Sequence, residues 1–389
     1  MWDAIGDALW LSLAMLWQIF WGLGLGFTLA AIIEQIVPKD TMAELLPDGG
    51  PRSLAIASGF GMASSSCSYA AVAMARSIVR KGSDFTAAMC FQIAATNLVI
   101  ELGLLLWLLI SWQFAVAEFV GGALMIVLLG LGYAWFLPSS LRTHATQQAR
   151  GDAKGSMEGH AAMAMGERSG SWRSRLMSRD GWVAISHSFV MNATMVWKDI
   201  VIGLLVAGAL GAWVPSSFWK AFFFDGGNPW LVALWGAVIG PLIAMAAFTC
   251  SVGNVPLAAV LWNGGISFGG VVAFMFGDLI IPPLLNIYRK YYGAKPMWFL
   301  LGSFYLTMVV AALCVDGLFT LAGLVPEARN ATEDLAHIRF NYTSVLDIVF
   351  GVVALTLVVV FVRTGGPAMM RRMGDDGDDD GDAAEGATS

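Results

Sequence analysis

Charged side chains are scarce in this chain. Asp, Glu, Lys and Arg make up 13% of its 389 residues, whereas 57% of the residues are hydrophobic. Soluble domains carry about 25% charged residues, so a soluble protein of this length would lack the polar residues needed to cover its surface. The same composition excludes a disordered chain, and the lack of a broad basic surface argues against nucleic acid as a partner. The composition therefore favours a helical membrane protein whose main surroundings are the lipid bilayer.

Cysteine and catalytic motifs are also rare. The four cysteines lie far apart and form no C-x-x-C pair, so neither a zinc ribbon nor a disulfide framework is indicated. We interpret Cys90 and Cys314 as buried small apolar residues. The sequence has no G-x-x-x-x-G-K-[ST] and no H-E-x-x-H motif, so it predicts neither a nucleotide-driven motor nor a zinc-protease site of that kind. We expect no catalytic residues, no enzyme activity and no cofactor.

Two apolar stretches, 53–80 and 229–263, differ from the other long apolar segments. Clusters of Gly, Ser and Pro interrupt both stretches, and such clusters break the hydrogen-bond ladder of a helix. We therefore expect an all-α transmembrane bundle in which each interrupted stretch forms a re-entrant hairpin of two half-helices. The remaining apolar segments have the length of a membrane span, about 20 residues. They predict continuous helices over 8–37, 84–112, 114–137, 183–214, 266–287, 297–325 and 345–363.

The positions of Lys and Arg predict the orientation and the domains. The longest polar loop carries several arginines, and such loops lie on the cytoplasmic side of a membrane. We therefore expect a multi-pass inner-membrane protein whose central loop and C-terminal tail are cytoplasmic. The expected parts are a first transmembrane repeat over 1–138, a flexible basic loop over 139–181, a second repeat with a final helix over 182–363, and a disordered acidic tail over 364–389.

The two halves of the chain resemble each other. WGLGLGFTLAAIIEQIVP, which ends at Pro38, matches KDIVIGLLVAGALGAWVP, which ends at Pro215. The segments around Cys67 and Cys250 match as well, and so do ATNLVIE and GDLIIPP, which pair Asn97 with Asp278. The loop charges place the two halves in opposite orientations, which predicts an inverted repeat. Transporters with inverted repeats bind their substrate near the middle of the membrane, on broken helices.

Each interrupted stretch has a polar cluster around one thiol. Half-helix N-termini favour anions and lower the pKa of a cysteine, and thiolates bind soft metals and metalloids. If the hairpins enter from opposite faces, their tips meet and bring the two thiols together. Packing is the alternative, because small residues also let membrane helices approach closely. The candidate substrate-binding residues are Cys67, Ser66, Ser68, Cys250, Thr249, Ser251, Asn254 and Asn97, with Cys67 and Cys250 as candidate metal ligands.

Ionisable residues inside the apolar segments are costly and are therefore functional candidates. Asp278 and Glu101 are expected near the middles of their helices, where either could carry a coupling proton. Asn97 is expected one turn before Glu101, on the same face of a continuous helix. A structural, hydrogen-bonded carboxylate is the alternative for Asp278. We expect Glu34, Glu118, Asp316 and Asp347 to lie in solvent, because they fall near helix ends.

The cysteine-containing segments carry a family resemblance. SSSCSYAAVAMARSIVRKGSDF, followed in the second half by TCSVGNVPLAAVLWNGGISF, resembles the bacterial predicted-permease family, which includes organoarsenical efflux permeases and proposed copper/zinc exporters. The resemblance implies a permease of the cytoplasmic membrane, and by motif it places a ligand for trivalent arsenic on Cys67 or Cys250. The first motif lacks the proline that often follows in the family, and SSSCS has one thiol where some members have two.

Together these observations predict a secondary permease that exports a soft metal, a metalloid or an organoarsenical compound and so confers resistance to it. The substrate would bind between the two hairpins, and the direction of transport comes from the resemblance alone. A passive channel, a membrane enzyme and a non-transporting scaffold remain as alternatives. Few histidines occur, and they lie mainly outside the interrupted stretches, which argues against the enzyme. The sequence leaves open whether the protein forms a homo-oligomer.

Overall fold

The computed structural model describes residues 2–36, 46, 48–64, 68–80, 82–150, 178–224, 227–247, 251–329, 331 and 342–367. Within these ranges the regular secondary structure is entirely helical, as expected. Among the described residues, five segments are long and apolar enough to cross a membrane, and Phe268–Ile280 with Pro282–Tyr292 make a sixth if their 44° bend lies within one span. The five are Phe85–Leu109, Trp112–Phe136, Pro229–Ala247, Ala294–Leu321 and Ser344–Arg363.

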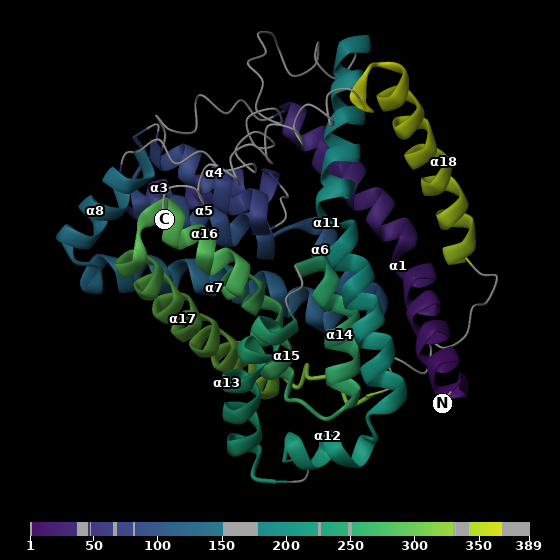
Figure 1. The fold of residues 1–389 in the computed structure, drawn as a ribbon. Helices are drawn as coiled ribbons and strands as arrows, with labels where there is room; N and C mark the ends of the chain where they lie inside the picture. Colours follow the sequence, from purple (N-terminus) through teal and green to yellow (C-terminus); the bar gives the residue numbers. More distant parts are fainter. Residues whose placement is uncertain are drawn as a thin grey trace, which may run out of the picture.

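Two long helices form one side of the molecule. Helices α1 (Trp2–Ile36) and α11 (Arg179–Trp213) run side by side, and α18 (Tyr342–Arg363) packs against both (Figure 1). Small residues allow the close approach of α1 and α11, because a side chain at Gly208 would collide with Ser12. The Ser12 hydroxyl donates across this contact to the Leu204 carbonyl at 2.9 Å. Many apolar side chains of α18 are exposed, as expected for a surface in contact with lipid.

The other side is a compact bundle in which the same order of elements occurs twice. In each half two pairs of helices lie between two long helices, and the second half adds a short helix before its first pair and a 3-10 helix within its second pair. The first half contains α3 (Pro51–Ser64), α4 (Ser68–Arg80), α5 (Phe85–Asn97), α6 (Ile100–Leu109) and α7 (Trp112–Phe136). The second contains α12 (Ser216–Phe222), α13 (Pro229–Ala247), α14 (Ser251–Asn263), α15 (Phe268–Phe276), η1 (Gly277–Ile280), α16 (Pro282–Tyr292) and α17 (Ala294–Leu321).

Helices α5 and α15 each begin at a polar cap. Asp84 caps α5 by accepting hydrogen bonds from the backbone N–H groups of Thr86 at 2.8 Å and Ala87 at 3.3 Å. Ser267 caps α15 in the same way and accepts a bond from the Gly270 N–H at 3.0 Å. Such caps satisfy donors that the first turn of a helix leaves unpaired. The repeated order of elements agrees with the sequence repeat, whereas the opposite orientation of the halves stays a prediction.

Three expectations about helices need correction. The segments 84–112 and 266–287 are not continuous helices, because α5 ends at Asn97 and α15 ends at Phe276. The loop expected over 139–181 begins with a helix, α8 (Ser139–Arg150). The fully buried Arg76 fixes α8, because its Nε donates to the Ala149 carbonyl at 3.2 Å and its guanidinium lies 4.3 Å from the centre of the Tyr291 ring.

Candidate functional site

Asp278 lies at a break in the helix that the sequence predicts to be continuous. Its segment, η1, is a short 3-10 helix between α15 and α16, and its side chain is fully buried. Two features of the sequence produce the break. Gly277 packs closely against α13, where a Cβ atom would lie 2.9 Å from the Cα of Pro241. Ile281 is extended, with φ −63° and ψ 146°, because Pro282 follows it and disfavours helical geometry at the preceding residue.

Two serines from the interrupted stretches bind this carboxylate. Ser68 is the first residue of α4, Ser251 is the first residue of α14, and the hydroxyls of both donate to the same oxygen of Asp278, Oδ2. The two interrupted stretches, whose serines are more than 180 residues apart in sequence, therefore meet at one point inside the bundle. The N-termini of two 13-residue helices converge there, and their dipoles favour a negative charge.

The carboxylate changes the interpretation of the half-helix N-termini. The sequence predicts that these ends favour an anion, and in the structure a carboxylate of the protein itself holds that position. An incoming anion would be repelled by Asp278 unless a proton or a cation neutralised it first. The second oxygen of Asp278, Oδ1, is buried and has no hydrogen-bond partner among the described residues. This oxygen is where a proton or a cation would bind.

A chain of hydrogen bonds holds η1 in place. The Tyr288 hydroxyl of α16 donates to the carbonyl of Leu279 at 3.1 Å, and the Gln92 amide of α5 donates to the Tyr288 hydroxyl. The Leu279 carbonyl would otherwise be left unsatisfied by the helix break, which is costly inside a membrane. Gln92 and Tyr288 are both fully buried. The position of Asp278 therefore depends on residues of both halves of the chain.

The equivalent break in the first half lies between α5 and α6. Asn97 is the last residue of α5, and Val99 is extended with φ −100° and ψ 139°. The Asn97 side chain is fully buried, and neither atom of its amide has a hydrogen-bond partner among the described residues. Adjacent glycines of α7 contact the two breaks, because Gly122 packs against Leu98 and Gly121 against the Phe276 ring. One turn of α7 thus lies against both breaks.

The structure also buries Asn254 and Glu101. Asn254 lies in α14, three residues after Ser251, and is fully buried. Glu101 lies in the first turn of α6, and its Oε1 has no hydrogen-bond partner in the described part of the chain. The expectation that Asn97 and Glu101 share a face of one helix is wrong, because the break at Leu98 and Val99 separates them. The expected mid-helix positions of Glu101 and Asp278 are wrong for the same reason.

Sequence reasoning missed Glu118. This residue of α7 was expected in solvent, but it is 1% exposed, and its carboxyl group interacts electrostatically with Asp278. Asp347 is also buried, contrary to expectation, whereas Asp316 is half-buried. Asp316 accepts a bond from the Gly269 N–H at 2.7 Å and Asp347 from the Trp21 N–H at 2.9 Å. The Glu34 side chain lies outside the described residues. An acidic residue within an apolar run was the signal for Glu118, because such residues are functional candidates by default.

The remaining candidates lie outside the described residues. These are Ser66, Cys67, Thr249 and Cys250. In sequence, Cys67 directly precedes Ser68 and Cys250 directly precedes Ser251. Of the other two cysteines, Cys90 is buried as expected, whereas Cys314 is exposed and that expectation is wrong. The described residues contain no group of three or more His, Cys, Asp or Glu that could hold a metal ion.

Comparisons with known proteins agree in pointing to a permease. The model of a family described as "Predicted permease" (ArsP_1) matches residues 4–317. The chain is 53% identical over 340 residues to the Mycobacterium tuberculosis protein named "Putative permease Rv2963". That alignment covers 87% of this chain and 84% of the mycobacterial protein. No solved structure matches the chain.

Proposed function

We propose, from the premise that the chain belongs to the predicted-permease family, that it is a secondary permease whose substrate binds where the two interrupted stretches meet. One observation carries the proposal: Ser68 and Ser251, from different halves, donate to one oxygen of the buried Asp278. Transporters of small solutes place their sites on such discontinuous helices, where both halves contribute. A site built in this way can open to either side if one half moves against the other.

The proposed substrate is a soft metal, a metalloid or an organoarsenical compound. Cys67 and Cys250 directly precede the two serines in sequence. Thiols bind soft ions as thiolates; the half-helix N-termini favour this form, while the negative charge of Asp278 opposes it until a proton or a cation neutralises that charge. Asp278 repels anions, so the proposed cargo is a cation or a neutral electrophile that thiols can bind. Ser66, Thr249, Asn254 and Asn97 would supply further polar contacts.

A coupling role for Asp278 is supported by its Oδ1 atom, which has no hydrogen-bond partner among the described residues. A proton on Oδ1 would neutralise the carboxylate, and a cationic substrate would be attracted to its charged form. Proton and substrate would then compete for the same charge, which is the requirement for exchange of one against the other. Glu118 and Glu101 are buried carboxyl groups that could relay the proton. Export and the cytoplasmic position of the central loop belong to this proposal and come from the family and the loop charges.

Resistance measurements with matched cysteine variants test the proposal. Cells carrying the wild type would be exposed to metals, metalloids and organoarsenicals, in parallel with cells carrying Cys67→Ser or Cys250→Ser. We expect both variants to lose protection, whereas Cys90→Ser and Cys314→Ser, which lie in continuous apolar helices, keep it. Equal protection by all four variants, against every compound that the wild type resists, would rule out the thiol ligands. Flux in proteoliposomes containing only this protein excludes the scaffold alternative.

A further inference from the structure

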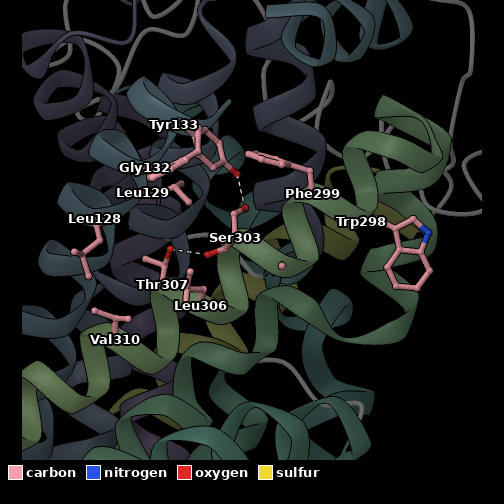
Figure 2. A pocket seen from close by; sticks show the side chains of 12 residues that line it. Leu128, Leu129, Gly132, Tyr133, Trp298, Phe299, Ser303, Leu306, Thr307 and Val310 are labelled. Atoms are coloured by element: carbon pink, nitrogen blue, oxygen red, sulfur yellow. Dashed lines mark hydrogen bonds between the residues drawn. The ribbon is translucent and has the colours of Figure 1, made fainter. Parts of the chain in front are cut away.

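A groove on the outside of the bundle lies between α7 and α17. It has a volume of about 500 Å³, and its walls are mainly apolar side chains such as Leu129, Leu306 and Val310 (Figure 2). Two glycines create the groove. A Cβ atom added at Gly132 of α7 or at Gly302 of α17 would have no atom within 4 Å. The space therefore exists because both helices lack a side chain where their surfaces face it.

The hydroxyl groups of the groove are already paired. The hydroxyls of Tyr133 and Ser303 are 2.9 Å apart and form a hydrogen bond, and the Thr307 hydroxyl donates to the Ser303 carbonyl at 2.6 Å (Figure 2). An occupant consequently meets apolar carbon rather than free donors or acceptors. A hydrocarbon chain fits this surface, whereas a polar solute would lose its hydration without compensation.

The length of the groove matches one leaflet of a bilayer. Its lining residues on α17 run from Trp298 to Val310, which at 1.5 Å per residue is about 18 Å. One leaflet is half of a hydrocarbon core about 30 Å thick. Both α7 and α17 are candidate membrane spans, so the groove lies at the depth of lipid tails. Exposed aromatic side chains stand at one end, Trp298 and Phe136 among them, as is typical of the membrane–water interface.

Positive charge lies at that same end. Lys295 is exposed and lies one helical turn before Trp298 and Phe299. Lys295, Phe299, Gly302 and Leu306 follow each other at spacings of three or four residues, so they share one face of α17. Arg289 and Lys290, in the last turn of α16, lie just before this helix and are also exposed. Basic residues at the end of a membrane groove favour an anionic headgroup.

We propose that this groove binds an anionic phospholipid, with one acyl chain between Gly132 and Gly302 and the phosphate at Lys295. The groove has positive charge at one end and spans a single leaflet, and both features suit a lipid. A helix of a second copy would need a surface as long as the whole span. The site is separate from Asp278, so the proposal stands or falls independently of the transport function.

Native mass spectrometry of the purified full-length protein, with phosphatidylglycerol or phosphatidylcholine added, tests the proposal. Gly302→Leu and Gly132→Leu fill the groove, and each should lose most of the bound phosphatidylglycerol. Gly317→Leu is the matched control, because it also has open space around it on α17 but does not line the groove. Lys295→Gln should lower the affinity for phosphatidylglycerol by about fivefold and leave the affinity for phosphatidylcholine unchanged.

Several outcomes would overturn the proposal. One is equal lipid retention by Gly302→Leu, Gly317→Leu and the wild type. Another is a loss of dimers, rather than of lipid, in the groove-filling variants, because this would identify a second copy as the occupant. A third is an equal affinity of the wild type for the two lipids. Size-exclusion profiles identical to the wild type establish that each variant is folded, so a loss of lipid reports on the groove itself.

Discussion

The helix breaks at Asn97 and Asp278 occupy matching places in the two halves, but they are held differently. The amide of Asn97 has no hydrogen-bond partner among the described residues, whereas Asp278 accepts bonds from Ser68 and Ser251. The first half thus contributes a neutral group and the second a carboxylate. The repeat has placed a helix break in each half, and the side chain at the break gives each half its own chemistry. The charge of the proposed site comes from the second half.

Exchanging the two side chains tests this comparison and should have the largest effect. Asp278→Asn keeps an acceptor for the two serines but removes the charge, so the protein should fold and lose its protection against the substrate. Adding Asn97→Asp to this variant should not restore protection, because no described hydroxyl bonds to position 97. Cell survival and the amount of protein in the membrane are the measurements. Full protection by the double variant would mean that the two breaks are equivalent.

Removing the hydroxyl of Ser68 or of Ser251 should have a smaller effect, and the effect should be similar for the two serines. Ser68→Ala or Ser251→Ala leaves Oδ2 of Asp278 with one hydroxyl donor, and each should lower the free energy of unfolding by about 1–3 kcal/mol. The two losses should not be additive, because both hydroxyls bind one oxygen. Ser58→Ala is the control, since that hydroxyl bonds only within α3, to the Leu54 carbonyl at 2.7 Å. Thermal or denaturant unfolding in detergent measures the effect, and strict additivity would contradict the shared acceptor.

Substitutions at the adjacent glycines of α7, Gly121 and Gly122, should have the smallest effect and test the comparison most closely. Gly121→Ala would press on the Phe276 ring, where a Cβ would lie 2.6 Å from Cζ, and Gly122→Ala would press on Leu98, where it would lie 2.7 Å from Cδ2. Both substitutions should lower the free energy of unfolding by about 1–3 kcal/mol, because both overpack a buried contact. Only Gly121→Ala disturbs the break that carries Asp278, so it should slow transport more. An equal loss of transport would show that the Asn97 break matters as much.

Local patterns were sufficient to predict part of this arrangement. The serines beside Cys67 and Cys250 were identified because polar residues interrupt two apolar stretches at matching places. Asp278 was identified because a carboxylate in an apolar run is costly. The meeting of these residues follows from the fold of two halves, and the sequence predicts it only through the repeat.

Other features depend on packing between distant segments. The break at Leu98 has no glycine or proline beside it, so neither of these helix-breaking residues marks it. The break at Ile281 had a signal, Pro282 followed by Pro283, which the length of the apolar run outweighed. Glu118 lies only a few residues inside α7, and its burial depends on the helices that surround it. The groove between Gly132 and Gly302 required both helices to be placed.

Flux driven by a pH gradient in proteoliposomes tests the central claim most directly. The substrate would be the compound against which the wild type protects cells, and the proteins would be the wild type, Asp278→Asn and Glu118→Gln. If Asp278 binds the coupling proton between the two breaks, the gradient should accelerate flux through the wild type and have no effect on Asp278→Asn. Flux through Asp278→Asn that responds to the gradient as strongly as flux through the wild type would contradict the account.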